Sequence, residues 1–339
     1  MGIGDFLRKD AETPLRELYM AGGAVCSVST NCRALLDAAD ETFLPLESPP
    51  PAVDFSIRFW IDNTTSAEPP WPKPYVRGLD HLVFAGFDTG SSMLVDLRTR
   101  RVIGRFTVGM ATDLSYWKTV IFPILLTIVA PSVGVAELHC ACVARGENGI
   151  LLAGPSGSGK STLAAALSQS GFGFLSDDRT FCSRRGNQLH AWGLPTRLKL
   201  RGEARVWFQQ IHNCEPTQSQ KGEPVFWLEP ERDLTVKRMR SCRPRVVMFL
   251  EQQHESEFRM TRVSPLEAMR RLNKDLIAAS PDEVVKQSET LAKLVGLPCW
   301  LLRYAGPPPR IAGMIAERFE KHLNNRSRHH RKMARTIEV

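Results

Sequence analysis

The sequence lacks the patterns that mark secreted, metal-stapled and membrane-spanning chains. Its eight cysteines include no Cys-x-x-Cys pair and none of the spacings of a zinc site or a disulfide framework, so we expect reduced thiols. Residues 1–10 lack the apolar core of a signal peptide. The longest apolar run, Val120 to Val129, contains Pro123 and reaches about half of the roughly 20 residues of a membrane span. These absences predict a soluble, cytoplasmic protein with no membrane span, in which the apolar run forms a buried helix.

The sequence also lacks an excess of positive charge distributed over the whole chain. The formal net charge is +8, but residues 321–339 hold six Lys and Arg against the single acid Glu338 and so supply +5 of it. The other 320 residues carry only +3. We therefore expect no specific nucleic-acid binding. Residues 324–339 are expected to form a basic, disordered tail, which could touch an anionic partner.

What is present is the composition of a globular chain. The 339 residues are 43% hydrophobic and 24% charged, which excludes wholesale disorder, and their number suggests about two domains. Proline-rich stretches punctuate the first hundred residues, where strands are expected over 53–61, 93–97 and 102–107. We predict a β-rich α+β region over residues 1–110. It shows no catalytic spacing and is a candidate substrate-binding region.

A second, α/β domain is expected over residues 111–323. An apolar stretch at 135–143, a Gly-bounded turn at 145–149 and the short apolar run Ile150–Ala153 indicate an antiparallel hairpin that ends in a buried strand. Later helices are indicated by capping sequences at Ser264-Pro-Leu-Glu267 and Ser280-Pro-Asp-Glu283, and by the four-residue spacing of Ile311, Ile315 and Phe319.

A glycine-rich string, Gly154-Pro-Ser-Gly-Ser-Gly-Lys-Ser161, follows the Ile150 strand directly and opens an alanine-rich helix over 162–170. It fully matches the G-x-x-x-x-G-K-[ST] phosphate loop (P-loop, or Walker A), in which N–H groups converge and the helix amino end adds its dipole. Such a nest suits the triphosphate of ATP. We expect Lys160 to project into solvent and neutralise phosphate oxygens, and the Ser161 hydroxyl to ligate Mg²⁺. The alternative is a flexible loop without a ligand. The candidate ATP-binding residues are Gly154, Ser156, Gly157, Ser158, Gly159, Lys160, Ser161 and Thr162.

Two adjacent acids, Asp177 and Asp178, follow the next predicted strand, 172–175. In a strand–loop–helix–strand unit the crossover returns parallel, so this strand ends at the same edge of the sheet as the phosphate loop. One carboxylate is needed to hold Mg²⁺, and the other could accept a proton from an attacking hydroxyl. The alternative is that the pair forms a turn or caps a helix.

Two further features are less specific. His139 closes the strand on the far side of the hairpin, where a lone His is usually a core or surface residue. Arg197, Lys199 and Arg201 alternate, so an extended backbone places them on one face. That face could clamp phosphate or could simply be solvated.

The run from His139 through Asp178 resembles the catalytic domain of the HPr kinase/phosphorylase family and its HPr-kinase-like relatives in peptide-modification gene clusters. The resemblance is close over some 40 residues and loose over 130–320. It implies a P-loop kinase domain similar in fold to phosphoenolpyruvate carboxykinase, which phosphorylates a serine hydroxyl of a protein or peptide with ATP. It also implies an active-site role for His139 and makes Asp178 or its neighbour the base, so we assign Asp178 to that role and Asp177 to Mg²⁺ with Ser161.

The chain departs from the family at one signature. The bifunctional enzymes carry Glu-x-Arg-Gly-x-Gly, whereas here Lys199-Leu-Arg-Gly-Glu-Ala204 has neither the Glu nor the second Gly. This departure disfavours phosphate removal and HPr as substrate. We therefore expect an Mg²⁺-dependent serine kinase acting on another peptide or protein; a nucleotide-binding module or ATPase that drives a partner, a small-molecule kinase, and assembly into a homo-oligomer are left open.

Overall fold

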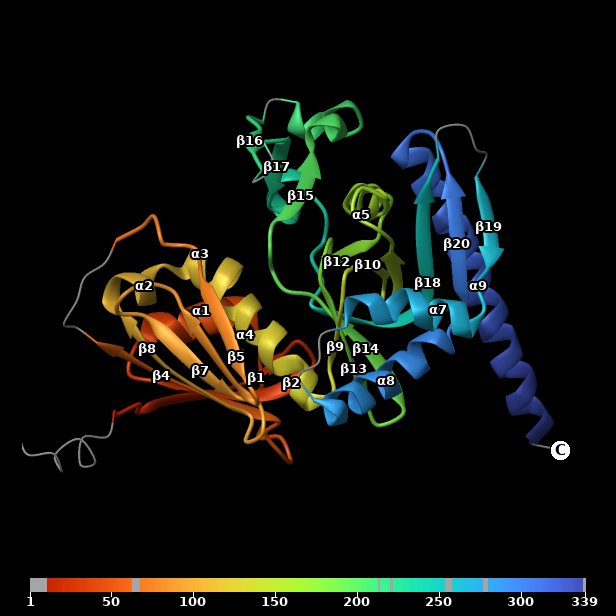
Figure 1. Ribbon diagram of the computed structural model, residues 1–339. Coiled ribbons are helices and arrows are strands. Elements are labelled where there is room, and N and C mark those ends of the chain that lie inside the picture. Colours follow the sequence, from red (N-terminus) through yellow and green to blue (C-terminus); the bar gives the residue numbers. More distant parts are fainter. Residues whose placement is uncertain are drawn as a thin grey trace, which may run out of the picture.

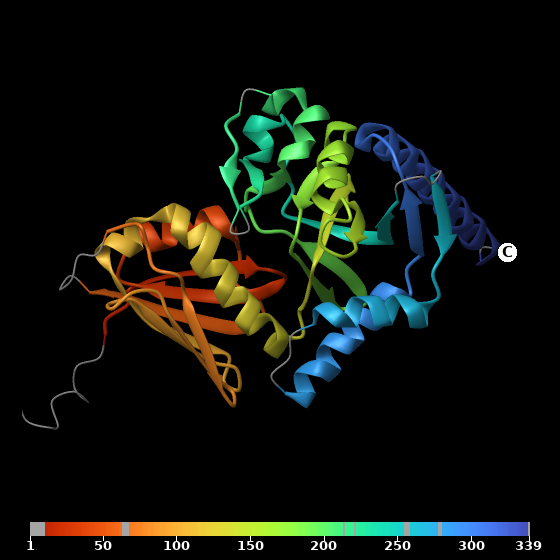
Figure 2. The same cartoon turned by 45° about the horizontal axis from the view of Figure 1, so that its top comes forward.

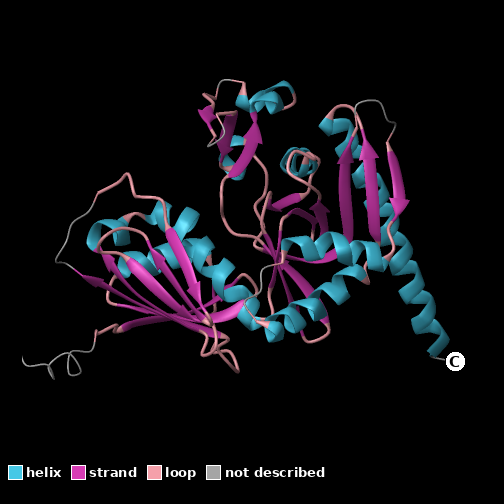
Figure 3. Cartoon of the chain, viewed as in Figure 1, coloured by secondary structure: helices cyan, strands magenta, loops and turns pink. Residues whose placement is uncertain are grey.

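Two large sheets organise the chain into a mixed α/β fold, shown by the computed structural model in Figures 1 and 3. The structure describes residues 11–62, 68–212, 214–219, 222–253, 258–276 and 280–337, without the side chains of Asp275 and 326–337. The expectations for residues 1–10 and for the basic side chains of the tail lie outside the described residues. All eight cysteines are free thiols, as expected.

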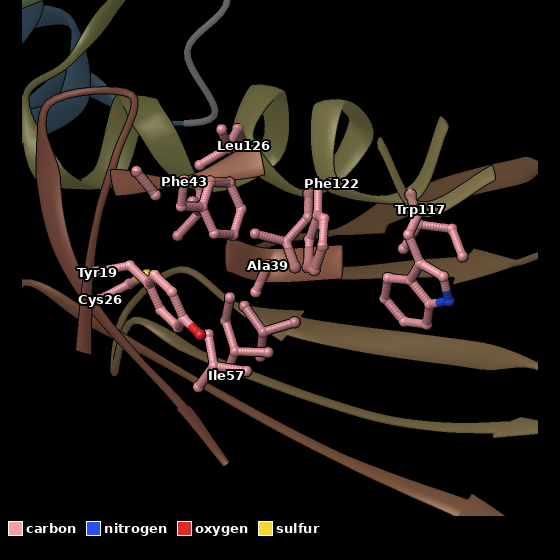
Figure 4. Close-up of a cluster of buried hydrophobic side chains, with 14 of the residues drawn as sticks. Tyr19, Cys26, Ala39, Phe43, Ile57, Trp117, Phe122 and Leu126 are labelled. Carbon is pink, nitrogen blue, oxygen red and sulfur yellow. The ribbon is translucent and has the colours of Figure 1, made fainter. Parts of the chain in front are cut away.

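The N-terminal sheet has eight strands in the order β3-β1-β2-β4-β8-β7-β6-β5. Helices cover one of its faces (Figure 1), and aromatic side chains such as Trp117 and Phe122 fill the space between helices and strands (Figure 4). The three strands expected here are confirmed as β4, β7 and β8. The elements are β1 Leu15–Ala21, β2 Ala24–Thr30, α1 Arg33–Thr42, β3 Leu44–Pro45, β4 Phe55–Asp62, β5 Tyr75–Leu79, β6 Leu82–Gly86, β7 Ser92–Asp96, β8 Arg101–Thr107, α2 Val108–Thr112, α3 Leu114–Tyr116, a π-helical turn Trp117–Ile121 and α4 Phe122–Val129.

The apolar run at 120–129 lies inside this N-terminal unit. Among the described helices, the stretch Leu114–Val133 is the one long and apolar enough to cross a membrane, and 56% of its apolar window is buried. Phe122 and Leu126 are at most 2% exposed and belong to the buried cluster of this unit (Figure 4). The run is therefore a core helix of a globular unit, as the sequence predicts.

The second sheet contains the predicted hairpin. β10 and β11 pair antiparallel with Cys140 opposite Ala153, and β11 continues into parallel pairs with β18 and then β20. β12 pairs antiparallel with the other side of β10, so β12 and β11 run in the same direction with β10 between them. Their carboxyl ends consequently lie at one edge, as expected from the crossover. The strands are β9 Ala136–Leu138, β10 Cys140–Arg145, β11 Asn148–Ala153, β12 Gly173–Ser176, β13 Thr180–Arg185, β14 Gln188–Trp192, β18 Ser241–Gln252, β19 Arg259–Arg262 and β20 Cys299–Tyr304.

Helices and a three-stranded sheet surround the second sheet (Figure 2). The predicted caps are confirmed: Ser264 and Ser280 each accept a hydrogen bond from the backbone of the Glu three residues later. Ile311, Ile315 and Phe319 are buried on the last helix, also as expected. The elements are α5 Lys160–Gln169, β15 Leu198–Arg201, β16 Thr217–Gln218, β17 Pro224–Leu228, α6 Pro230–Asp233, α7 Pro265–Leu272, α8 Pro281–Val295 and α9 Pro308–Ile337.

The backbone of α9 continues as far as Ile337, through residues for which the sequence predicts a disordered tail. This stretch contains no Pro or Gly, and four of residues 324–337 are Arg, which has a high helix propensity. The backbone is therefore helical where the sequence predicts disorder.

The two sheets share an apolar contact. Phe181 of β13 and Trp192 of β14 belong to the same buried cluster as the N-terminal core. The β1–β2 turn fits closely against them, because a Cβ on Gly23 would lie 2.6 Å from the indole nitrogen of Trp192. The N-terminal unit therefore contacts β13, the strand that follows Asp177 and Asp178, and its partner β14.

Candidate functional site

Two short connections between strands bring His139 and Asp178 together. His139 lies between β9 and β10, and Asp178 lies between β12 and β13. The strands on both sides of these connections are paired, β10 with β12 and β9 with β13. The Thr180 hydroxyl also donates to the carbonyl of Cys140 at 2.9 Å. As a result, Nδ1 of His139 is 3.1 Å from Oδ1 of Asp178.

The glycine loop, Gly154–Ser161, connects β11 to α5 at the same edge. Gly159 has a φ of +86°, and a Cβ there would lie 2.3 Å from the phenolic oxygen of Tyr304. This Tyr hydroxyl donates to the Ser158 carbonyl at 2.7 Å and fixes the loop from outside. Sequence reasoning missed Tyr304, although it ends β20, which runs parallel with β11 through β18 and therefore finishes at the loop edge.

Lys160 differs from the expectation that it projects into solvent. Its side chain is buried, and its ammonium lies 2.7 Å from the Gly154 carbonyl, 3.2 Å from the Pro155 carbonyl and 3.1 Å from Nε2 of His139. The reason is that a residue opening a helix directs its side chain back over the turn before it. The nearest acceptors there are the carbonyls of the loop itself.

The contacts of His139 favour one tautomer of its ring. An ammonium can only donate, so the tautomer that fits the Lys160 contact accepts at Nε2. That tautomer carries its hydrogen on Nδ1, which lies beside Asp178. The three side chains form a relay in which Lys160 donates to His139 and His139 donates to Asp178. The relay ends on a carboxylate whose side chain is 56% exposed.

Asp177 occupies a different environment from Asp178. It is only 6% exposed, and its Oδ2 accepts the backbone N–H of Lys199 at 3.0 Å. Burial raises the pKa of Asp177 to about 6, and the negative charge of Asp178 raises it as well. Hydrogen bonds from Lys199 and Ser161 lower the pKa and offset part of this effect. The adjacent acids are therefore a buried carboxyl beside Ser161 and a half-exposed carboxylate beside His139.

The remaining candidates divide between the loop and its rim. Ser156 and Gly157 are exposed at the loop tip, and Ser161 and Thr162 are partly buried in the first turn of α5. Of the three alternating cations, Lys199 lies over the Trp227 ring and Arg197 pairs with Glu229 at 3.1 Å. Only Arg201 approaches the loop, since a Cβ on Gly157 would be 3.6 Å from its guanidinium.

The arrangement fits a nucleotide phosphate tail with Mg²⁺. The Ser158 hydroxyl is buried with no hydrogen-bond partner among the described residues, and the Gly157 and Gly159 backbones have positive φ, as in a nest of N–H groups. Ser161 and Asp177 supply hard oxygen ligands side by side. No described cluster of three or more His, Cys, Asp or Glu could hold a metal alone, but Mg²⁺ commonly takes one or two carboxylates plus phosphate oxygens.

Comparison with known proteins gives little. No family model matches the chain, and no curated protein matches it. Among solved structures, the HPr(Ser) kinase/phosphatase from Coxiella burnetii is similar at 13% sequence identity and a TM-score of 0.33, over 57% of this chain and 96% of that one.

Proposed function

We propose that this protein is an ATP-dependent, Mg²⁺-dependent kinase that phosphorylates a serine hydroxyl of a peptide or protein. The observation that carries the proposal is the relay from Lys160 through His139 to Asp178, which ends on a half-exposed carboxylate beside the glycine loop. A site that only bound a nucleotide would need the loop but no oriented carboxylate next to it. The class of acceptor, serine in a peptide or protein, follows the resemblance of the 139–178 run.

Each side chain has a role in this proposal. The loop N–H groups and Lys160 would hold the phosphates, and Ser161 with Asp177 would hold Mg²⁺. Bound ATP supplies the phosphoryl group, and Mg²⁺ neutralises its charge. Asp178 would accept the proton that the serine hydroxyl loses, and the Nδ1–H of His139 keeps the Asp178 carboxylate oriented while leaving its second oxygen accessible.

The test uses labelled ATP and candidate peptides encoded by genes near the gene of this protein, followed by mass spectrometry of the products. Asp178→Asn should keep nucleotide binding but lose transfer by about 10²-fold or more, because an amide cannot accept a proton at neutral pH. Asp37→Asn is the matched control, since Asp37 is similarly exposed (50%) and also takes part in an ion pair, with Arg33 in α1.

The outcomes separate the proposed kinase from its rivals. Phosphoserine formed by the wild type and by Asp37→Asn, but not by Asp178→Asn, supports the proposal. Full transfer by Asp178→Asn removes Asp178 as the base. ATP hydrolysis that is indifferent to every peptide and insensitive to Asp178→Asn identifies a partner-driving ATPase, and transfer to small metabolites alone identifies a small-molecule kinase.

A further inference from the structure

Within the described residues, one face of the N-terminal sheet carries no helix. Helices α1 to α4 all lie against the opposite face (Figures 1 and 2). The burial pattern agrees: along β4, Phe55, Ile57 and Phe59 are buried in the core, whereas Arg58 between them is exposed. We call the helix-free side, formed by β5, β6, β7, β8 and β4, the open face.

The strand register aligns apolar side chains in a row across this face. Phe84 on β6 is opposite Leu94 on β7, and Leu94 is opposite Ile103 on β8. Phe84 and Ile103 are 44% and 45% exposed. On edge strand β5, Tyr75 and Leu79 share the same face and are also exposed. Exposed apolar residues that are contiguous, rather than scattered, are typical of an interaction site.

Arginines stand at both ends of the row. Arg77 on β5 is opposite Phe84, and Arg58 on β4 is opposite Ile103. Arg101 on β8 is on the same face. Arg16 on β1, which lies beyond β2, is on this face too. None of these four arginines makes an ion pair with a described residue, although Arg58 donates hydrogen bonds to the Thr13 hydroxyl at 3.0 Å and the Ala11 carbonyl at 2.8 Å.

The acids of this face do not balance these arginines. Asp62 pairs with a fifth arginine, Arg105, at 2.9 Å. Asp96 lies opposite Arg101 in the register and accepts hydrogen bonds from Thr99 within its own turn. Five arginines thus face two aspartates, and the face combines an apolar centre with an excess of positive charge.

We infer that the open face binds an acidic amphipathic helix of a partner polypeptide. Neighbouring strands are about 4.8 Å apart, and residues three or four apart on a helix are about 5–6 Å apart, so a helix lying across the strands can place successive apolar residues on Phe84, Leu94 and Ile103. Acidic residues at its two ends then meet Arg77 and Arg58. A second copy of this chain fits poorly, because two identical faces would oppose their unpaired arginines. The inference does not depend on kinase chemistry.

The test titrates the full-length protein into a fluorescent peptide of about 14 residues with Leu on one helical face and Glu at both ends. A peptide of the same composition with its Leu residues scattered around the helix is the control. We expect saturable binding of the first peptide, at least about tenfold weaker binding of the second, and weaker binding as salt rises. The variants Phe84→Ser and Ile103→Ser should each weaken binding about tenfold or more, and Arg58→Glu with Arg77→Glu should abolish it.

Val285→Ser is the matched control, because Val285 is a similarly exposed apolar residue (59%) on α8. Circular dichroism and thermal unfolding check that every variant is folded. Equal binding of both peptides, or binding untouched by the open-face variants, overturns the inference. So does preferential binding to vesicles of anionic lipid, concentration-dependent dimerisation abolished by Ile103→Ser, or much tighter peptide binding after removal of residues 1–10, which would make that segment the occupant.

Discussion

Asp177→Asn should stabilise the protein while impairing its site. Burial raises the pKa of Asp177 to about 6, whereas its ordinary value is 3.8. Because the folded pKa is the higher one, the folded state binds more protons between about pH 4 and pH 6, and the ionised carboxylate destabilises the fold above that window. The difference corresponds to about 3 kcal/mol.

The amide can preserve the local geometry. Its oxygen can accept the N–H of Lys199, and its nitrogen can donate to Ser161, so both hydrogen bonds of the carboxylate have substitutes. We therefore expect Asp177→Asn to exceed the wild type in free energy of unfolding by up to about 3 kcal/mol at about pH 8. The gain should shrink as the pH falls through about 6 and vanish near about 4. The same variant should weaken the Mg²⁺ dependence of transfer.

Urea unfolding of both proteins across this pH range measures the difference. Asp178→Asn is the control, because its half-exposed carboxylate contacts His139 near the surface, a pairing worth at most about 1 kcal/mol. A gain for Asp177→Asn that does not vary with pH would refute burial as its cause. A loss of stability at about pH 8 would show that the carboxylate is a net stabilising group.

Three other changes test the loop and the tail. Lys160→Ala should reduce transfer by about 10²–10³-fold and leave thermal unfolding within a few degrees of wild type, because its ammonium bonds to two loop carbonyls and to His139 rather than packing in the core; full activity would remove the loop from the mechanism. Gly159→Ala should destabilise the fold by about 1–3 kcal/mol and weaken ATP binding, whereas Gly146→Ala, also at positive φ but with no atom within 4 Å of its Cβ, should leave ATP binding intact. Equal ATP affinities of the two variants would show that the clash with Tyr304 does not affect ATP binding. Deleting residues 326–339 should leave turnover of a short peptide nearly unchanged, and any loss with an acidic partner should shrink as salt rises; a loss independent of salt would make the tail structural.

Local features of the sequence were enough to place one side of the site. The hairpin, the glycine loop and the two acids are adjacent along the chain, and the parallel return of β12 brings them to one edge. The contact of His139 with Asp178 depends on strand pairs that local sequence does not reveal. β10 must pair with β12 and β9 with β13, so that the two connections lie side by side. Only the resemblance to a family pointed to His139 beforehand.

Long-range contacts account for what the sequence could not predict. Tyr304 is about 145 residues from the loop it supports, and no local pattern distinguishes it from other strand tyrosines. The orientation of Lys160 depends on where the Gly154 and Pro155 carbonyls point, which the motif does not specify. The open face needed the register of five strands, because each strand alone shows only an alternating pattern.

The contact between the two sheets limits how the chain can be divided. A shorter chain that began at residue 111 would uncover Phe181 and Trp192, which are now buried against the N-terminal core. Phe181 follows the connection that contains Asp177 and Asp178, and Trp192 is its partner on β14. Such a fragment would expose an aggregation-prone apolar surface close to the site. Substitutions deep in the N-terminal core would accordingly reduce activity without approaching the glycine loop, so a mutational scan should find loss-of-function positions in both halves of the chain.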